Sequence, residues 1–417
     1  MEFQTISVIG LGYIGLPTAT VFASRQRKVI GVDVNQHAVD TINQGRIHIV
    51  EPDLDMLVHA AVSQGFLRAT NTPEPADAFL IAVPTPFLDD KRPDLSYIEA
   101  AAAAIAPVLK QGDLVVLEST SPIGATARMA DWLAAARPDL SFPHQAGARS
   151  DIRIAHCPER VLPGHVLREL VENDRIIGGM TPACSEAACR LYALFVRGRC
   201  IVTDARTAEM AKLTENAFRD VNIAFANELS MICDQIDVNV WELIGLANRH
   251  PRVNILQPGP GVGGHCIAVD PWFIVDAAPE RARLIRAARE VNDQKPGFVV
   301  ERVRQAAARF RDPVIACFGL SFKADIDDLR ESPAIEIVQE LSQEQLGTVF
   351  VVEPHISALP AALQGAELVS AQTAISRADI VVMLVDHQSF RTLDTDRLQS
   401  AVVIDTRGMW SAKRAQA

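Results

Sequence analysis

Short, uninterrupted apolar segments alternate with helical stretches in the N-terminal half of the chain. The helical stretches fall at 14–26, 97–110 and 124–136, and the apolar segments are TISVIG, KVIGVD, DAFLIAVP, DLVVLES, IRIAHCP and RIIGG. Continuous apolar strands separated by helices are typical of a parallel sheet that is covered by helices on both faces. Residues 1–202 are therefore predicted to form a doubly wound α/β domain.

From about residue 203 to 247 the pattern changes. Residues 207–236 have apolar side chains at helical spacing and contain neither glycine nor proline, which predicts one long helix. The alternation then resumes with VIACFG, TVFVVEPH, ADIVVMLVDH and AVVIDTRG. We therefore predict two doubly wound, Rossmann-like domains, at 1–202 and 298–417, joined by a helical part at 203–297. Because open α/β sheets bind ligands at the carboxyl ends of their strands, two such domains facing one another predict a cleft with two ligands.

The charge and the cysteine content of the 417-residue chain exclude several classes of protein. The chain has 51 acidic and 40 basic residues, a net charge of −11, which argues against sequence-independent nucleic-acid binding. Its seven cysteines form no Cys-x-x-Cys pair and no His/Asp/Glu cluster has metal spacing, so no metal is predicted. The apolar runs are strand-sized, and the N-terminus reads as a strand rather than a leader peptide. We expect a cytoplasmic protein with reduced cysteines and no membrane insertion.

The segment Gly10-Leu-Gly12-Tyr-Ile-Gly15 has the spacing of a dinucleotide-binding turn. It follows the strand ISVI and opens a predicted helix, and Asp33 ends the next strand eighteen residues past Gly15. Such glycines allow a tight turn and the close approach of a pyrophosphate to the amides at the helix N-terminus. A carboxylate at Asp33 would accept hydrogen bonds from the ribose and repel a 2′-phosphate, which favours NAD over NADP. FAD binding and a purely structural glycine turn also fit this segment taken alone.

A second glycine-rich segment, residues 258–266 (PGPGVGGHC), ends in a cysteine. Glycine loses more backbone freedom on folding than any other residue, so a loop this rich in glycine indicates a main chain that lies flat against a ligand. A thiol at Cys266 near a cation could attack a carbonyl, and a buried, inert cysteine is the alternative. Asp270, four residues on, could hold a water molecule or orient a neighbour, and taken alone it fits a strand-capping role equally well.

Polar residues share one face of the predicted long helix. Lys212, Asn216 and Arg219 are spaced i, i+4 and i+7. A solvated charge stripe is the usual explanation, but asparagine is a poor helix former, and a polar face directed into a cleft would explain Asn216. Lys212 could then stabilise an oxyanion or exchange a proton. Two more loops, 156–164 and 322–333, would place charged side chains at the carboxyl edges of the sheets.

These motifs, in this order, resemble those of the UDP-sugar dehydrogenases, the UDP-glucose/GDP-mannose dehydrogenase family. The resemblance runs nearly from end to end and rests on GLGYIGLP, ESTSPIG, CPER, the helix segment KLTEN, GGHCIAVD, and FK with RESP. Residues 158–164 and 248–261 are similar to the branch that oxidises UDP-N-acetyl-D-mannosamine for bacterial surface polysaccharides of the enterobacterial common antigen type. The UDP-glucose branch has a Pro-Glu-Phe-Leu segment with a second glutamate, which is absent here, so UDP-glucose is the less favoured substrate.

The resemblance implies a four-electron oxidation of the C6 alcohol to a carboxylate, with two NAD⁺ per turnover. The aldehyde would be captured by Cys266 as a thiohemiacetal, oxidised to a thioester and released by water. Lys212 and Asn216 would stabilise the oxyanion, and Lys212 would share proton handling with Asp270. The residues implied to position the hydrolytic water are Glu159 and Thr120.

By the same resemblance, a further set of residues contacts the two ligands. The implied NAD contacts are Gly10, Gly12, Tyr13, Ile14, Gly15, Asp33, Thr85, Thr126 and Arg330. The implied UDP-sugar contacts are Arg160, Val161, Lys212, Asn216, Arg219, His250, Arg252, Gly263, Phe322 and Lys323. Arg407 stands where close relatives have lysine, which keeps a phosphate contact and changes its geometry. In this family Arg252 reaches the partner subunit's substrate, so a homodimer is implied.

Three other functions fit parts of the sequence. Within the same family, the substrate could be UDP-N-acetylglucosamine or UDP-glucose. A two-electron β-hydroxyacid dehydrogenase shares a Rossmann domain and a long helix, but it needs neither the cysteine loop nor the third domain. A non-catalytic NAD-binding sensor would not need the lysine, the cysteine and the two carboxylates in matching motifs.

Overall fold

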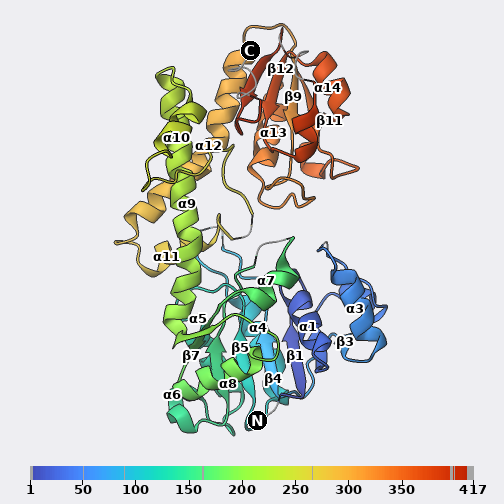
Figure 1. Ribbon diagram of the computed structural model, residues 1–417, viewed down its shortest axis with the longest axis vertical. Helices are drawn as coiled ribbons and strands as arrows, with labels where there is room; N and C mark the ends of the chain where they lie inside the picture. The colour runs from blue at the N-terminus through green and yellow to red at the C-terminus, as the bar shows by residue number, and fades with distance from the viewer. Residues whose placement is uncertain are drawn as a thin grey trace. The chain divides into compact units, whose positions relative to one another are not determined.

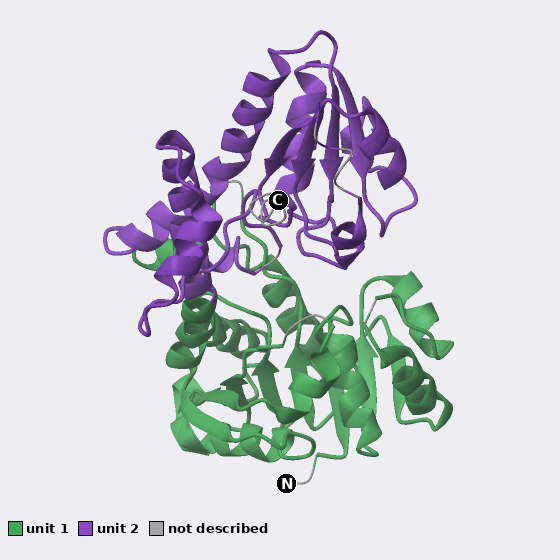
Figure 2. Ribbon diagram, turned by 45° about the horizontal axis from the view of Figure 1, so that its top comes forward, with its two compact units in different colours: residues 1–215, 272–278 green, residues 216–271, 279–417 purple. Residues whose placement is uncertain are grey.

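The computed structural model describes residues 3–49, 51–88, 90–161, 164–264, 266–394, 398 and 400–410. The chain separates into two compact units, which Figure 2 shows in different colours. Unit 1 comprises residues 1–215 and 272–278, and unit 2 comprises residues 216–271 and 279–417. The three-part division predicted from the sequence, with boundaries after residues 202 and 297, stays a prediction.

An eight-stranded sheet forms the centre of the described part of unit 1 (Figure 1). In the order β3-β2-β1-β4-β5-β6-β7-β8 it contains β3 (Leu67–Thr70), β2 (Lys28–Val32), β1 (Thr5–Ile9), β4 (Ala78–Ile81), β5 (Leu114–Leu117), β6 (Arg153–His156), β7 (Arg175–Gly179) and β8 (Cys200–Asp204). The connecting helices are α1 (Gly15–Ser24), α2 (Gln36–Asn43), α3 (Leu54–Ser63), α4 (Ser96–Ile105), α5 (Ala125–Ala136), α6 (Pro143–Ala146), α7 (Val166–Glu172) and α8 (Pro182–Tyr192). The predicted α/β class is confirmed.

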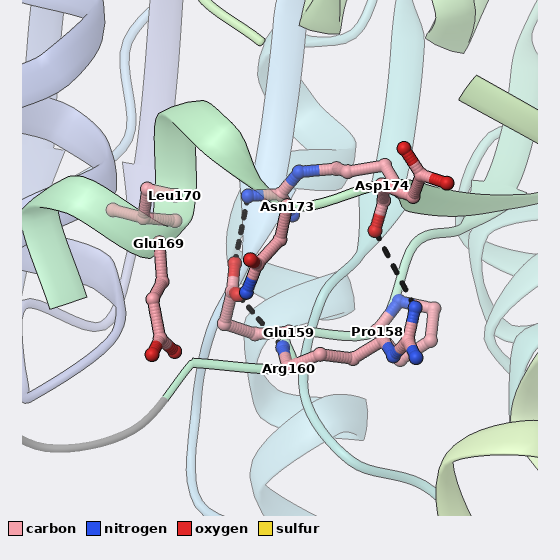
Figure 3. Close-up of a pocket in the computed structure, with 8 residues that line it drawn as sticks. Pro158, Glu159, Arg160, Glu169, Leu170, Asn173 and Asp174 are labelled. Atoms are coloured by element: carbon pink, nitrogen blue, oxygen red, sulfur yellow. Dashed lines mark hydrogen bonds and ion pairs between the residues drawn. The ribbon is translucent and has the colours of Figure 1, made fainter. Parts of the chain in front are cut away.

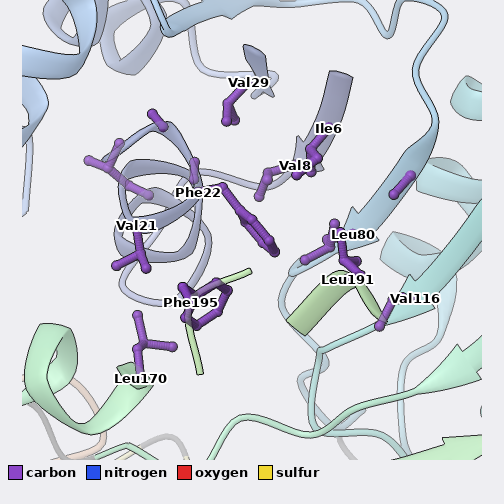
Figure 4. Close-up of a cluster of buried hydrophobic side chains, with 14 of the residues drawn as sticks. Ile6, Val8, Val21, Phe22, Val29, Leu80, Val116, Leu170, Leu191 and Phe195 are labelled. Carbon is purple, nitrogen blue, oxygen red and sulfur yellow. The ribbon is translucent and has the colours of Figure 1, made fainter. Parts of the chain in front are cut away.

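Apolar clusters cover both faces of this sheet. Because successive side chains of a strand point to opposite faces, Leu80 of β4 belongs to one cluster and Phe79 to the other. The first cluster includes Phe22 of α1, whose ring meets the ring of Phe195 edge-on at a centroid distance of 4.8 Å (Figure 4). Burial of each such side chain contributes about 1.5–3 kcal/mol. The helices packed in this way fix the positions of the carboxyl ends of the central strands at one edge of the sheet.

The last two strands of this sheet depart from the predicted parallel arrangement, because β7 is reversed and β8 pairs parallel with β7. β7 pairs antiparallel with β6, with Ala155 opposite Gly179 and His156 opposite Gly178. The parallel prediction is therefore wrong for the segment RIIGG. A continuous apolar strand indicates burial on both faces and not direction, because direction depends on the path of the connecting chain. Sequence analysis also missed the strands LRAT (β3) and CIVTD (β8), which are short and half polar.

The predicted long helix is present as α9 (Ala205–Gln235), which begins in unit 1 and ends in unit 2. The helix stops before Asp237, whose φ of 55° lies in the left-handed region. α10 (Val240–Ala247) then begins with its own cap, because the Asn239 side chain accepts hydrogen bonds from the N–H groups of Trp241 and Glu242. α11 (Asp270–Ala277) and α12 (Arg283–Ala307) follow. Within the described residues, no helix has both the length and the apolar character needed to cross a bilayer.

The described part of unit 2 contains a five-stranded parallel sheet. Its order is β11-β10-β9-β12-β13, formed by β11 (Ala366–Leu368), β10 (Thr348–Val352), β9 (Val314–Phe318), β12 (Ile380–Met383) and β13 (Val402–Asp405). The order repeats that of β3-β2-β1-β4-β5 in unit 1, so the prediction of two Rossmann-like folds is confirmed. Apolar clusters again lie on both faces, with α13 (Pro333–Gln343) packed in one and α14 (Ala371–Arg377) in the other.

Candidate active site

The turn after β1 is built from three glycines with different roles. Gly10 has a φ of +90°, and a Cβ there would lie 2.6 Å from the carbonyl oxygen of Ala82. A Cβ on Gly15 would lie 1.7 Å from the carbonyl oxygen of Gly10, so α1 can pack this closely only with glycine at that position. At Gly12, by contrast, a Cβ would meet nothing within 4 Å. The fold therefore requires Gly10 and Gly15, whereas Gly12 borders open space.

Asp33 follows β2 and faces the same turn. One of its carboxylate oxygens accepts the N–H of Leu11 at 2.8 Å and the other accepts the N–H of Asn35 at 2.8 Å, yet the side chain stays half-exposed. Tyr13 and Ile14 lead into α1, whose first turn contains no acidic residue. An open glycine, a helix N-terminus without acidic residues and a carboxylate at the end of β2 are what the pyrophosphate and ribose of NAD need, so the residues present fit this cofactor.

Three threonines lie beyond β4 and β5, two of them predicted to contact NAD and one to position water. The Thr85 hydroxyl donates to the carbonyl oxygen of Thr120, and both residues are half-buried. Thr126 is buried in the first turn of α5, where its N–H and its hydroxyl both donate to a carboxylate oxygen of Glu209, at 2.8 and 2.6 Å. The other oxygen of Glu209 accepts the N–H of Gly124 at 2.6 Å.

Glu209 thus caps the N-terminus of α5 from the first turns of α9. Sequence reasoning did not assign it a role, because its partners lie more than 80 residues earlier in the chain. Burial raises the pKa of Glu209, and the three hydrogen bonds that it accepts oppose this shift. Since the Thr126 hydroxyl proton is already donated, Thr126 can offer a ligand only an acceptor oxygen.

Glu159, the residue expected to position water, belongs to a buried charge cluster. Its carboxylate accepts the N–H of Arg160 at 2.7 Å and pairs with the Arg175 guanidinium at 2.8 Å. Arg175 also lies 3.6 Å from the carboxylate of Glu118 and 4.5 Å from the centre of the Tyr192 ring. Tyr192 donates its hydroxyl proton to Glu118 at 2.6 Å. Two buried carboxylates therefore share one guanidinium.

Burial raises the pKa of Glu118 to about 7 from an ordinary value of 4.5, although Arg175 opposes the shift. In the folded protein Glu118 keeps its proton between pH 4.5 and 7, where the unfolded chain loses it. The free energy of unfolding should therefore fall by about 3 kcal/mol as pH rises through this range.

Glu118→Gln removes this titration and keeps an acceptor for Tyr192. We expect its free energy of unfolding, measured by urea titration at pH 5, 6, 7 and 8, to fall less with rising pH than that of the parent. Parallel curves for the two proteins would show that Glu118 is not the titrating group.

A cavity of about 10 Å³ lies beside Glu159, between the loop after β6 and the end of α7 (Figure 3). This volume has room for one water molecule. Arg160, which also lines this cavity, pairs with Glu215 at 2.6 Å and reaches the carbonyl oxygen of Asp174. Val161 is half-buried beside the first apolar cluster. Lys212 is also half-buried, and no hydrogen bond or ion pair within the described chain engages its ammonium.

In unit 2, the glycine-rich loop packs on the segment that follows β9. A Cβ on Gly263 would lie 2.3 Å from the carbonyl oxygen of Glu331, and a Cβ on Gly264 would lie 3.0 Å from the ring of Phe322. On Gly259 it would meet the guanidinium of Arg407 at 2.7 Å. The structure therefore places two of the predicted substrate contacts, Gly263 and Phe322, against one another, and a third, Arg407, against Gly259 of the same loop.

The charged side chains of this region are held by neighbouring acids. The Arg407 guanidinium lies 2.7 Å from Asp386, and Arg330 forms two hydrogen bonds to Asp328, at 2.8 and 2.6 Å. Lys323 is half-buried beside Phe322. Arg330 was predicted to contact NAD and lies in the same segment as Phe322 and Lys323, which were predicted to contact the UDP-sugar.

Cys266 differs from the other six cysteines. It is exposed, whereas the others are buried or half-buried. Burial raises the pKa of the Cys189 thiol to about 11 and that of the Cys317 thiol to about 12, which makes them poor nucleophiles. The Asp270 N–H donates to the Cys266 carbonyl oxygen at 2.9 Å, and the Asp270 carboxylate accepts from the buried Asn216 amide at 2.5 Å. His265, beside the cysteine, lies outside the described residues.

The remaining predicted substrate contacts are surface residues. Arg219, His250 and Arg252 are exposed, and the Arg252 N–H donates to the Nδ1 of His250 at 3.3 Å. Their roles stay predictions.

Comparison with known proteins gives consistent matches along the chain. Three domain models of the UDP-glucose/GDP-mannose dehydrogenase family match it: the NAD binding domain at residues 4–196, the central domain at 206–294 and the UDP binding domain at 316–412. The chain is 84% identical over 417 residues to the NDP-N-acetyl-D-galactosaminuronic acid dehydrogenase of Ralstonia nicotianae, covering 100% of this chain and 99% of that protein. It is 62% identical over 419 residues to the UDP-N-acetyl-D-mannosamine dehydrogenase of Escherichia coli, covering 98% and 100%.

Solved structures of members of this family also match the chain. The UDP-D-ManNAc dehydrogenase of Pyrococcus horikoshii has a TM-score of 0.89 and 39% identity, covering 97% of this chain and 96% of that one. The UDP-N-acetyl-mannosamine dehydrogenase Cap5O of Staphylococcus aureus has a TM-score of 0.86 and 42% identity, covering 97% and 95%. The chain therefore belongs to the UDP-glucose/GDP-mannose dehydrogenase family and is an NAD-dependent UDP-sugar dehydrogenase, as its motifs predicted.

Proposed function

We propose that the protein oxidises the C6 alcohol of UDP-N-acetyl-D-mannosamine to the carboxylate in two successive oxidations, with Cys266 as the nucleophile. The observation that carries the proposal is the exposed thiol of Cys266 at the end of a glycine-rich loop that packs on Phe322. A two-electron β-hydroxyacid dehydrogenase needs no such thiol, and a sensor needs no catalytic thiol either. The matches to the central and UDP binding domains also argue against both alternatives.

Bound at the turn after β1, NAD⁺ would accept one hydride from C6 in each oxidation. The first oxidation removes a hydride and the hydroxyl proton from the alcohol and leaves an aldehyde. The Cys266 sulfur then bonds to C6, and the carbonyl oxygen takes up a proton in place of the one that the thiol gives up. Loss of the second hydride and of the hydroxyl proton leaves a thioester. Water then replaces the sulfur, which yields the carboxylate and restores the thiol.

In this proposal other side chains assist the covalent and hydrolytic steps. Asn216 would donate to the oxyanion that forms when sulfur attacks C6, and its amide is oriented by Asp270. Lys212 would add a positive charge there and exchange protons with Asp270. Glu159, held by the Arg175 guanidinium, would position the hydrolytic water together with Thr120.

UDP-N-acetyl-D-galactosamine is the second candidate substrate. Two Ralstonia proteins that are 84% and 82% identical to the chain are named for N-acetyl-D-galactosaminuronic acid, whereas those named for UDP-N-acetyl-D-mannosamine are 62–64% identical. The two sugars differ in configuration at C2 and C4, so a few contacts at the sugar ring decide between them.

The experiment is a comparison of four UDP-sugars with the purified enzyme: N-acetylmannosamine, N-acetylgalactosamine, N-acetylglucosamine and glucose. We expect two NADH per sugar consumed, measured by absorbance against product mass, and the highest kcat/KM with UDP-N-acetyl-D-mannosamine. A higher kcat/KM with the galactosamine sugar would assign the second candidate. One NADH per sugar with release of an aldehyde would contradict the four-electron reaction.

We also propose that the active form is a homodimer. Phe218, Phe225 and Ile232 on α9 are exposed, and their spacing of seven places them on one side of the helix. Exposed apolar stripes of this kind are typical of subunit interfaces. The proposal includes Arg252 reaching the substrate of the partner subunit, a cytoplasmic location and a product used for surface polysaccharide.

A further inference from the structure

The turn that follows β9 has the same backbone conformation and hydrogen bonds as the turn after β1, which fits NAD in unit 1. Gly319 has a φ of +93°, as Gly10 has +90°. The Gly319 N–H donates to the carbonyl oxygen of Val352 at 2.8 Å, as the Gly10 N–H donates to that of Val32 at 2.8 Å. The residue after Gly319 is Leu320, and a carboxylate again follows the second strand of the pair.

That carboxylate is Glu353, which stands where unit 1 has Asp33. Glu353 accepts the N–H of Leu320 at 2.7 Å, and its other oxygen accepts the N–H of His355 at 3.1 Å. Asp33 accepts the equivalent two N–H groups. The two units therefore share not only a strand order but also the hydrogen bonds that shape the first turn.

The two carboxylates differ in what else they touch. Asp33 is half-exposed, whereas the side chains of Glu353 and His387 are both 0% exposed and lie 3.0 Å apart. Glu353 is thus covered by an imidazole and is closed to a ribose. In unit 2 the acid that a dinucleotide would use has become part of an internal pair.

The hydrogen bonds define the tautomer of His387. Its Nδ1 lies 2.9 Å from the backbone nitrogen of Asp325, and a backbone N–H can only donate, so Nδ1 is the acceptor. Nε2 therefore carries the proton and donates it to Glu353. Glu353 holds the beginning of the turn at Leu320, and His387 holds its end at Asp325. Between these two points lie Phe322 and Lys323.

A metal site is the other interpretation of this cluster. Ligand atoms of Asp325, His355 and His387 lie within 4.8 Å of one another, a grouping that sequence spacing did not predict. However, both ring nitrogens of His387 are already engaged, one by a backbone N–H and one by Glu353. A metal could bind His387 only by breaking one of these hydrogen bonds, so the contacts favour a structural pair.

We propose that Glu353 and His387 are positioning residues that hold the 320–325 turn in the conformation that binds the UDP portion of the substrate. The pair touches no reacting atom and acts through Phe322 and Lys323. This inference rests on the proposed function, because it takes these two residues to be UDP contacts.

The test measures binding of UDP alone to the full-length protein by calorimetry, with NAD⁺ binding measured in parallel. His387→Leu removes both hydrogen bonds, and we expect the Kd for UDP to rise about tenfold, while the Kd for NAD⁺ changes less than about twofold. His387→Asn keeps an acceptor near the Nδ1 position and should recover part of the loss. His59→Leu is the matched control, because this exposed histidine belongs to α3 of unit 1 and not to the 320–325 turn, and the variant should bind UDP as the parent does.

Glu353→Gln provides a second measurement if His387→Leu does not fold. It keeps the size of the side chain and weakens the bond to His387, so its Kd for UDP should also rise. Unchanged UDP binding in folded His387→Leu or Glu353→Gln would overturn the inference. Failure of the parent protein to bind UDP would instead contradict the proposed function.

Discussion

Replacing Cys266 with serine is expected to lower the rate of carboxylate formation by about 10³-fold or more. A serine hydroxyl is a far weaker nucleophile than a thiolate, and without covalent capture the aldehyde is free to hydrate or dissociate before the second oxidation. The measurement is a single-turnover reaction in which NADH is followed by absorbance and the sugar products by mass spectrometry. The variant should stop before the acid, with at most one NADH formed per sugar.

Cys200→Ser is the matched control for this experiment. Cys200 is half-buried at the start of β8, and burial raises the pKa of its thiol. The control should therefore form carboxylate at the parent rate. A Cys266→Ser enzyme that did the same would show that the nucleophile has been wrongly assigned.

Replacing Arg175 with methionine is expected to lower the free energy of unfolding by about 3–5 kcal/mol at pH 7. The guanidinium is 5% exposed and is the shared partner of Glu118 and Glu159, so its loss leaves the buried Glu159 carboxylate without a counter-charge and removes the cation that allows Glu118 to ionise near pH 7. Its contact with the Tyr192 ring is also lost. Methionine keeps much of the volume, so the effect reports the charge rather than a cavity. Urea titration of the parent and the variant measures it.

The free energy of unfolding that Arg175→Met loses should be smaller at pH 5 than at pH 7. Burial already raises the pKa of Glu118 to about 7 when Arg175 is present, and without Arg175 this pKa rises further. At pH 5 Glu118 is then protonated and needs no partner. Arg199→Met is the control, because Arg199 is 84% exposed and its ion pair with Asp174 should contribute no more than about 1 kcal/mol. Equal, small losses for both variants would contradict the shared-cation arrangement.

Local patterns in the sequence determined the folds of both sheets and pointed to the turn where NAD is expected to bind. Apolar segments between helices predicted both Rossmann-like folds, because a strand that is buried on both faces is a continuous run of apolar residues. The turn at Gly10 to Gly15 was predictable because its glycines and the following strand and helix lie within twenty residues. Cys266 was identified by its loop, and the structure adds that it is the exposed member of the seven cysteines.

The tertiary structure decided the features whose partners are distant in the chain. The antiparallel direction of β7 depends on the path of the preceding loop, which no local pattern encodes. Glu209 caps a helix 83 residues earlier, and Glu353 meets His387 across 34 residues. Each of these contacts requires two chain segments to pack first, because a hydrogen bond between distant residues forms only where the folded core brings their side chains together.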